Sequence, residues 1–99
     1  MTANRVQRAD RFTVSDAVHT RQFDDELIIL DLGAGAYFAL DTIGTRAWEG
    51  LAGGKSVEET AVEFSREYEV EFDRALADLL KLVEDLVSRG ILILAPGVA

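Results

Sequence analysis

Residues 26–48 constrain the fold of this chain more than any other segment. Glu26–Leu32 is apolar at nearly every position, which is typical of a central strand covered on both faces. Gly33-Ala34-Gly35 permits a tight turn, and Tyr37–Leu40 then predicts a further strand. Leu32–Leu40 contains no charge and no proline, although edge strands normally carry such residues to block pairing with other chains. This strand is therefore expected either to be covered within its own fold or to be kept open for a partner strand.

The chain before this segment predicts the first strand of a meander. Apolar and β-branched residues alternate from Phe12 onward, so a half-buried strand is expected to begin there and to end between Val18 and Phe23. Asp24-Asp25 signals the turn into the next strand. Three consecutive strands joined by short turns form an antiparallel meander, which places the third strand on an edge.

Two helices are expected after the strands. Asp41 or Thr42 can cap the first, and Gly53-Gly54 ends it. Ser56 and Glu59 form a capping box, which opens the second helix. The apolar stripe of this second helix consists of Val57, Ala61, Val62, Phe64 and Tyr68.

A longer third helix is expected from a cap at Asp73 to about Arg89, with Gly90 as its left-handed terminator. Ile91–Leu94 is expected as a short closing strand or an extended tail. Ala75 and Leu82 lie to one side of the helix stripe, so the helix either sinks deeply into a small core or lines a groove. The fold class is α+β and winged-helix-like: a three-stranded antiparallel meander followed by three helices. The core stripe is Leu76, Leu79, Leu80, Val83, Leu86 and Val87.

Length and composition indicate one domain. The chain has 99 residues, of which 48% are hydrophobic, enough for one modest core. Residues 1–10 are expected to form a flexible tail and residues 11–95 the folded domain. The chain has no cysteine, no signal-peptide pattern and no run approaching the roughly 20 apolar residues of a membrane helix, so a cytoplasmic protein without membrane contact is expected.

The sequence offers little for enzyme chemistry. His19 is the only histidine, and without cysteine it cannot build the usual zinc sites. The row Glu58, Glu59, Glu63 and Glu67 matches the solvent face of a helix rather than a catalytic pair. The glycine turn lacks the third glycine of a dinucleotide fingerprint. No catalytic residue, metal or cofactor is therefore predicted.

The charge distribution disfavours nucleic acid as a partner. The net charge is −8, and outside the first 22 residues the chain carries 16 acidic against 6 basic residues. A recognition helix should bring arginine, lysine or amides to the groove, whereas both later helices present mainly carboxylates. A winged-helix DNA-binding regulator is kept as an alternative, as is a module that self-associates through its open edge.

Peptide binding by strand addition fits the open edge better. An added strand gains affinity from backbone hydrogen bonds and specificity from side-chain pockets. Because strand side chains alternate, Phe38 and Leu40 are expected to face inward toward Trp48. Tyr37 is then the aromatic side chain most available to a ligand.

One ordered set of residues resembles the PqqD-like family, also called RiPP recognition elements. The set runs Leu30-Asp31, Gly35-x-Tyr37-Phe38-x-Leu40-Asp41-x-x-Gly44-x-x-x-Trp48, then Gly54-x-Ser56-Val57-Glu58-Glu59. The likeness extends from about Phe12 to Leu94. Asp41 stands where many relatives have asparagine, but either residue caps a helix. A domain of this length looks most like the free-standing leader-binding protein of lasso-peptide biosynthesis.

The resemblance implies a non-catalytic adaptor. The open edge by itself leads us to expect a monomer or a weak edge-strand dimer. Family members bind the leader of a ribosomally made precursor peptide as a strand added to the third strand, in a groove walled by the third helix. They present it to a leader-cleaving cysteine protease and an asparagine-synthetase-like macrocyclase. Carried over by position, the peptide-binding residues are Gly35, Ala36, Tyr37, Phe38 and Ala39 on the strand, and Arg74, Ala75, Asp78, Lys81, Leu82 and Asp85 on the helix.

Overall fold

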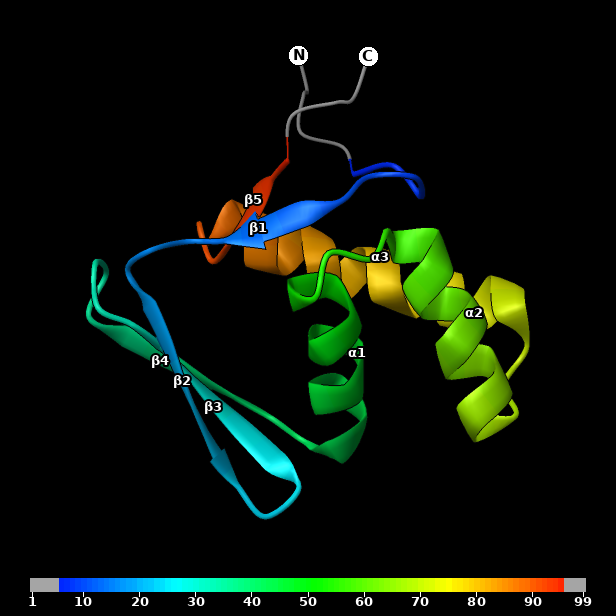
Figure 1. Cartoon of the computed structure of the whole chain (residues 1–99), viewed down its shortest axis with the longest axis horizontal. Coiled ribbons are helices and arrows are strands. Elements are labelled where there is room, and N and C mark those ends of the chain that lie inside the picture. Colours follow the sequence, from blue (N-terminus) through cyan, green and yellow to red (C-terminus); the bar gives the residue numbers. More distant parts are fainter. Residues whose placement is uncertain (1–5, 96–99) are drawn as a thin grey trace.

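The computed structural model describes residues 6–95, which form two small sheets and three helices (Figure 1). The three-stranded sheet lies on one side of α1, and α2 lies on the other. The α+β winged-helix-like class predicted from the sequence is confirmed. In chain order the elements are β1 (Phe12–Val14), β2 (Val18–Phe23), β3 (Glu26–Asp31), β4 (Ala36–Leu40), α1 (Thr42–Ala52), α2 (Val57–Tyr68), α3 (Phe72–Ser88) and β5 (Leu92–Leu94).

The meander is the sheet β2-β3-β4, with β3 at its centre. Its second turn is built by Asp31, whose Oδ1 accepts hydrogen bonds from the backbone N–H groups of Gly33 and Ala34. Gly35 completes the turn at φ +69°, a conformation that favours glycine. This turn fixes the register in which Asp31 faces Ala36 and Ile29 faces Phe38.

The expectation that β3 is covered on both faces is wrong. Leu27 and Ile29 are buried on the inner face, whereas Ile28 and Leu30 on the other face are only half-buried. The helices gather on one side of the sheet, so the second face keeps an apolar sequence without a second layer.

The predicted first strand is two strands that belong to different sheets. The N–H of Val18 bonds to the carbonyl of Ser15, a turn that ends β1 after Val14. Only β2 joins the meander, while β1 pairs antiparallel with β5, Phe12 facing Leu94. The alternation of apolar residues continues across this turn, so the sequence did not reveal that β1 and β2 are separate strands.

The expected helix caps hold for α1 and α2. Asp41 Oδ1 accepts a hydrogen bond from the Gly44 N–H at 2.8 Å, and Ser56 with Glu59 forms the complete capping box. Gly53 is the C-cap of α1, as expected.

The start predicted for α3 is wrong, and its end is confirmed. The helix begins at Phe72 with Glu71 as an N-cap that makes no side-chain hydrogen bond, so Asp73 lies inside the first turn. Phe72 packs against the core, which anchors this end by apolar contact in place of a cap. At the other end Gly90 adopts φ +77°, and the N–H groups of Gly90 and Ile91 bond to Val87 and Leu86 in a Schellman motif.

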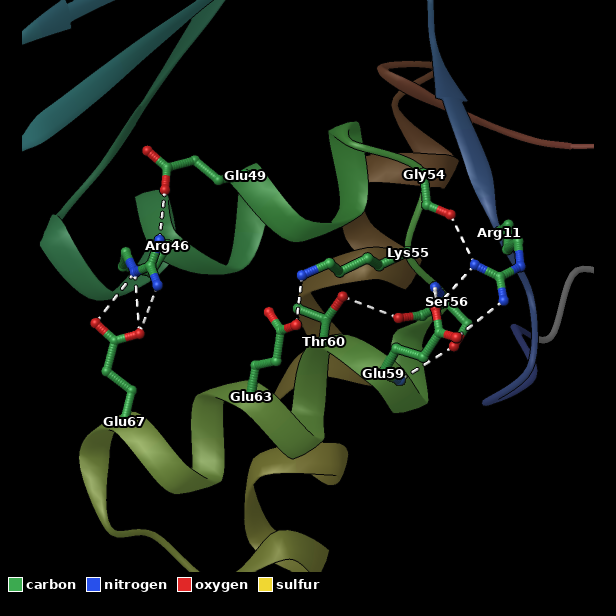
Figure 2. Close-up of polar contacts among 10 residues, drawn as sticks. All are labelled: Arg11, Arg46, Glu49, Gly54, Lys55, Ser56, Glu59, Thr60, Glu63 and Glu67. Atoms are coloured by element: carbon green, nitrogen blue, oxygen red, sulfur yellow. Dashed lines mark hydrogen bonds and ion pairs between the residues drawn. The ribbon is translucent and has the colours of Figure 1, made fainter.

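The interface of α1 and α2 is unusually close at Gly50. A Cβ atom placed there would lie 2.9 Å from Cγ2 and Oγ1 of Thr60. The Thr60 hydroxyl donates to the Ser56 carbonyl, so this side chain is fixed (Figure 2). A side chain larger than that of glycine at position 50 would therefore force Thr60 or the helix to shift.

Ion pairs connect side chains on the outer surface of α1 and α2 (Figure 2). Arg46 of α1 bonds to Glu67 of α2 at 2.6 Å and to Glu49 at 2.8 Å. Lys55, in the loop between α1 and α2, pairs with Glu63 of α2. All of these side chains are substantially exposed, so they orient the helices more than they stabilise them.

The segment before β1 packs on the first turn of α2. The carbonyls of Arg8 and Asp10 accept hydrogen bonds from the Glu58 and Val57 N–H groups. Residues 6–10 belong to the predicted tail, and its remaining residues 1–5 lie outside the described part of the chain.

Candidate functional site

Strand β4 is an open edge of the three-stranded sheet. The Leu32 N–H bonds to the Ala17 carbonyl of the segment before β2. Because the backbone groups of alternate residues in a strand point to the same side, those of residues 28 and 30 of β3 also point toward β2. Leu27, Ile29 and Asp31 consequently bond to β4, where their partners are Leu40, Phe38 and Ala36.

The remaining backbone groups of β4 point away from the sheet. By the same alternation, the N–H and C=O groups of Tyr37 and Ala39 face the open edge. These two residues offer four hydrogen-bonding groups to a neighbouring strand, as strand addition requires.

The side-chain directions on β4 follow the predicted alternation. Phe38 and Leu40 are half-buried, lie opposite Ile29 and Leu27, and pack against the core that contains Trp48. Tyr37 is 71% exposed, and Ala39, which shares its face, is exposed as well. The inner face of an added strand would therefore continue the surface of Phe38.

The helix residues of the predicted site share one face of α3, with one exception. Ala75 is only 2% exposed and lies in the core, so its side chain is not available to a ligand. Leu82 is half-buried and also packs on the core. The other four residues, all exposed, are Arg74, Asp78, Lys81 and Asp85.

These four charged residues alternate in sign along the helix. Within residues 6–95 Arg74, Asp78 and Lys81 make no ion pair with one another or with other residues, whereas Asp85 pairs with Arg89 at 3.0 Å. In contrast, Arg46 and Lys55 on the α1–α2 surface are both paired.

Arg89 lies between the strand and helix parts of the predicted site, and the sequence did not single it out. Its guanidinium carbon lies 4.4 Å from the centre of the Phe38 ring, within range of a cation–π contact. Because Arg89 also bonds to Asp85, it links α3 to β4. The four-residue spacing from Asp85 predicts the ion pair, but nothing local predicts the contact with Phe38.

The resolved pKa shifts lie on the α1–α2 and β1–α2 surfaces. The hydrogen bond from Arg46 lowers the pKa of Glu67, and the hydrogen bonds from Arg11 and the Ser56 backbone lower that of Glu59. These are exposed ion pairs with ordinary structural causes. They do not indicate a catalytic acid or base.

The pocket between α1 and α2 is polar and is lined by these ion-paired side chains, among them Arg46, Lys55, Glu63 and Glu67. Within residues 6–95 no cluster of histidine, cysteine or carboxylate side chains could hold a metal ion. No helix in this range is long and apolar enough to span a bilayer.

The arginines near the N-terminus bear on the alternative of DNA binding. Arg8 and Arg11, which could have formed a basic arm, are engaged by Glu58 and Glu59 of α2 at 2.9 and 2.8 Å. The exposed face of α2 thus presents mainly carboxylates, with these two arginines neutralised and Arg66 as its own cation without an ion pair in residues 6–95.

Comparison with known proteins identifies the family of this chain. The family model for "Coenzyme PQQ synthesis protein D (PqqD)" matches residues 26–92. A solved structure of TbiB1 in complex with the TbiA(beta) leader peptide is 36% identical, with a TM-score of 0.77, covering 88% of this chain and 98% of that one.

A second solved structure is a lasso peptide synthetase B1 complexed with its leader peptide. It is 28% identical, with a TM-score of 0.77, and covers 84% of this chain and 98% of that one. No curated protein sequence matches the chain. The family model spans residues 26–92, more than half of the chain, and on this evidence the chain belongs to the PqqD family.

Proposed function

We propose that this protein is an adaptor that binds the leader segment of a ribosomally synthesised precursor peptide in lasso-peptide-type biosynthesis. The observation that carries the proposal is the open edge of β4, with the backbone groups of Tyr37 and Ala39 directed outward. The two similar solved structures support it, because each is described as a complex with a leader peptide.

The leader would add to β4 as a fourth strand. Its backbone would bond to Tyr37 and Ala39, and its inward side chains would meet Phe38 and the charged face of α3. The surface residues of this site are Gly35, Ala36, Tyr37, Phe38, Ala39, Arg74, Asp78, Lys81, Leu82 and Asp85, with Ala75 supporting them from the core.

The adaptor has no chemistry of its own in this proposal. It would deliver the precursor to a leader-cleaving cysteine protease and to an asparagine-synthetase-like macrocyclase. Its own contribution is affinity, which for a leader complex we expect between micromolar and nanomolar, about −8 to −12 kcal/mol.

The direct test is a calorimetric titration with the synthetic leader encoded by the neighbouring short reading frame. A scrambled peptide of the same composition is the control. We expect the leader to bind and the scrambled peptide not to bind. Absence of leader binding to the folded protein would reject the proposal.

Delivery is tested separately. Cleavage of the full precursor by the protease of the same gene cluster is measured with and without this protein. We expect faster cleavage when the adaptor is present. An unchanged rate, despite leader binding, would leave a peptide-binding protein that does not serve the protease.

A further inference from the structure

Arg89 lies over Phe38 of β4, the strand to which the proposed leader would add. It is the C-cap residue of α3, fixed there by the helix end at Gly90. Its guanidinium carbon lies over the Phe38 ring of the edge strand. Side chains directly opposite on neighbouring strands share a face, so an inward residue of an added strand would lie beside Phe38 and within reach of Arg89.

The bonding of Arg89 leaves its terminal nitrogens available. The Nε atom donates to Asp85 Oδ1 at 3.0 Å. Among residues 6–95, no acceptor receives a hydrogen bond from either Nη atom of Arg89, and the side chain is 51% exposed. Contact with an aromatic ring and one ion pair hold the guanidinium in place while two donor groups remain free.

A guanidinium held in this way is suited to a carboxylate. Its paired N–H groups match the two oxygens of a carboxylate more closely than a single carbonyl oxygen. The chain as a whole carries a charge of −8, which repels acidic peptides. Recognition of an acidic side chain here therefore needs a local cation, and Arg89 supplies one.

From this geometry we infer that Arg89 is a specificity-determining residue that selects an aspartate or glutamate in the bound leader, at the position that lies beside Phe38. This inference rests on the proposed function and adds the chemical class of the side chain that is read. The simpler interpretation is that Arg89 only neutralises the charge of Asp85 and the partial negative charge at the C-terminal end of α3. The two readings differ in what they predict for binding.

The test uses the full chain and the synthetic leader from the neighbouring reading frame, with each acidic residue of the leader replaced in turn by its amide. The variants are R89A, R89K and the control R66A. Arg66 is exposed, makes no ion pair within residues 6–95 and lies in the last turn of α2, so R66A changes the net charge equally. Thermal unfolding of each variant verifies that the fold is retained.

We expect R89A to weaken leader binding about tenfold, R89K to weaken it less, and R66A to leave it unchanged. Replacing one acidic residue of the leader by its amide should weaken binding to the wild-type protein by a similar factor. The same replacement should not weaken binding to R89A any further. Equal affinities of R89A and R66A would overturn the inference and leave the proposed function standing. The inference would also be overturned if R89A bound the leader more weakly but every amide replacement in the leader had the same effect on R89A as on the wild-type protein. Failure of the wild-type protein to bind the leader would reject both.

Discussion

Ala36 and Ala39 have opposite backbone roles, although both are small, exposed residues of β4. The Ala36 N–H faces β3, whereas the Ala39 N–H faces the open edge. The sequence alone could not separate them, because the register depends on where the Leu32 N–H finds its partner in the segment before β2.

Proline at these positions should therefore separate binding from stability. Proline removes one backbone donor and is tolerated on an edge strand when that donor faces outward. We expect A39P to keep its thermal midpoint and to bind the leader about fivefold or more weakly, since one hydrogen bond contributes about 1 kcal/mol.

The matched variant A36P, unlike A39P, should have a lower thermal midpoint, because it breaks the β3–β4 hydrogen-bond ladder. Calorimetry and thermal unfolding measure the two properties. A39P with undiminished affinity would mean that the peptide does not add to β4.

Two exposed carboxylates make the stability of the fold dependent on pH. The Arg11 hydrogen bond lowers the pKa of Glu59 from its ordinary 4.5, and the Arg46 hydrogen bond does the same for Glu67. The unfolded chain consequently takes up these protons at a higher pH than the folded chain does.

We expect the stabilisation from these carboxylates to be complete above about pH 4.5 and to be lost as the pH falls through their lowered folded-state pKa values. Urea unfolding at a series of acidic pH values measures this loss. E67Q should flatten the dependence, and E84Q, which changes an exposed carboxylate without an ion pair in residues 6–95, should not. Equal slopes for the two variants would contradict this assignment.

The side-chain directions on β4 could be predicted residue by residue because the strand alternates cleanly. The inward Phe38 and the exposed Tyr37 follow from that period of two. The burial of Ala75 and the contact of Arg89 with Phe38 were not predictable in the same way. Both depend on how α3 is rotated and placed against the sheet, which is set by packing over the whole core.

At the scale of elements, the α1–α2 pair is held by a contact that excludes a methyl group. Alanine normally stabilises a helix relative to glycine by about 1 kcal/mol. At Gly50 this gain meets the fixed, β-branched side chain of Thr60 at 2.9 Å.

We expect G50A to lower the free energy of unfolding by about 1–3 kcal/mol, because overpacking exceeds the gain in helix propensity. In a T60A background, which removes the atoms that the new methyl group would meet, the same change should be neutral or stabilising. Urea unfolding of the four proteins in this cycle tests the prediction. The same loss in both backgrounds would place its cause elsewhere.

The elements that sequence predicted best are those with local hydrogen-bonded signals. The Ser56–Glu59 box and Gly90 each fix a helix end within a few residues. The split between β1 and β2 and the start of α3 were mispredicted because distant partners decide them. Strand β1 pairs with β5 at the far end of the chain, and Phe72 anchors α3 through the core.

At the scale of the whole molecule, the open edge could serve either a peptide or a second copy of the chain. The two uses exclude each other because both would occupy the outward groups of Tyr37 and Ala39.

We expect sedimentation at several protein concentrations to show a monomer or a weak dimer, and saturating leader to convert any dimer into a monomer. A39P, which removes one of the shared donors, should lower the dimer fraction without peptide. A dimer that persists in the presence of bound leader would have to use a different surface.

The small number of outward residues on β4 has a consequence for engineering. Backbone hydrogen bonds accept any sequence, and an edge with two outward residues provides only a few of them. Discrimination between one peptide and another must then come from side chains, those of Tyr37 and Phe38 on the strand and the exposed charged residues of α3. The domain could therefore be given new peptide preferences by exchanging the exposed charged residues of α3. The backbone groups of β4 would still bind the peptide as an added strand.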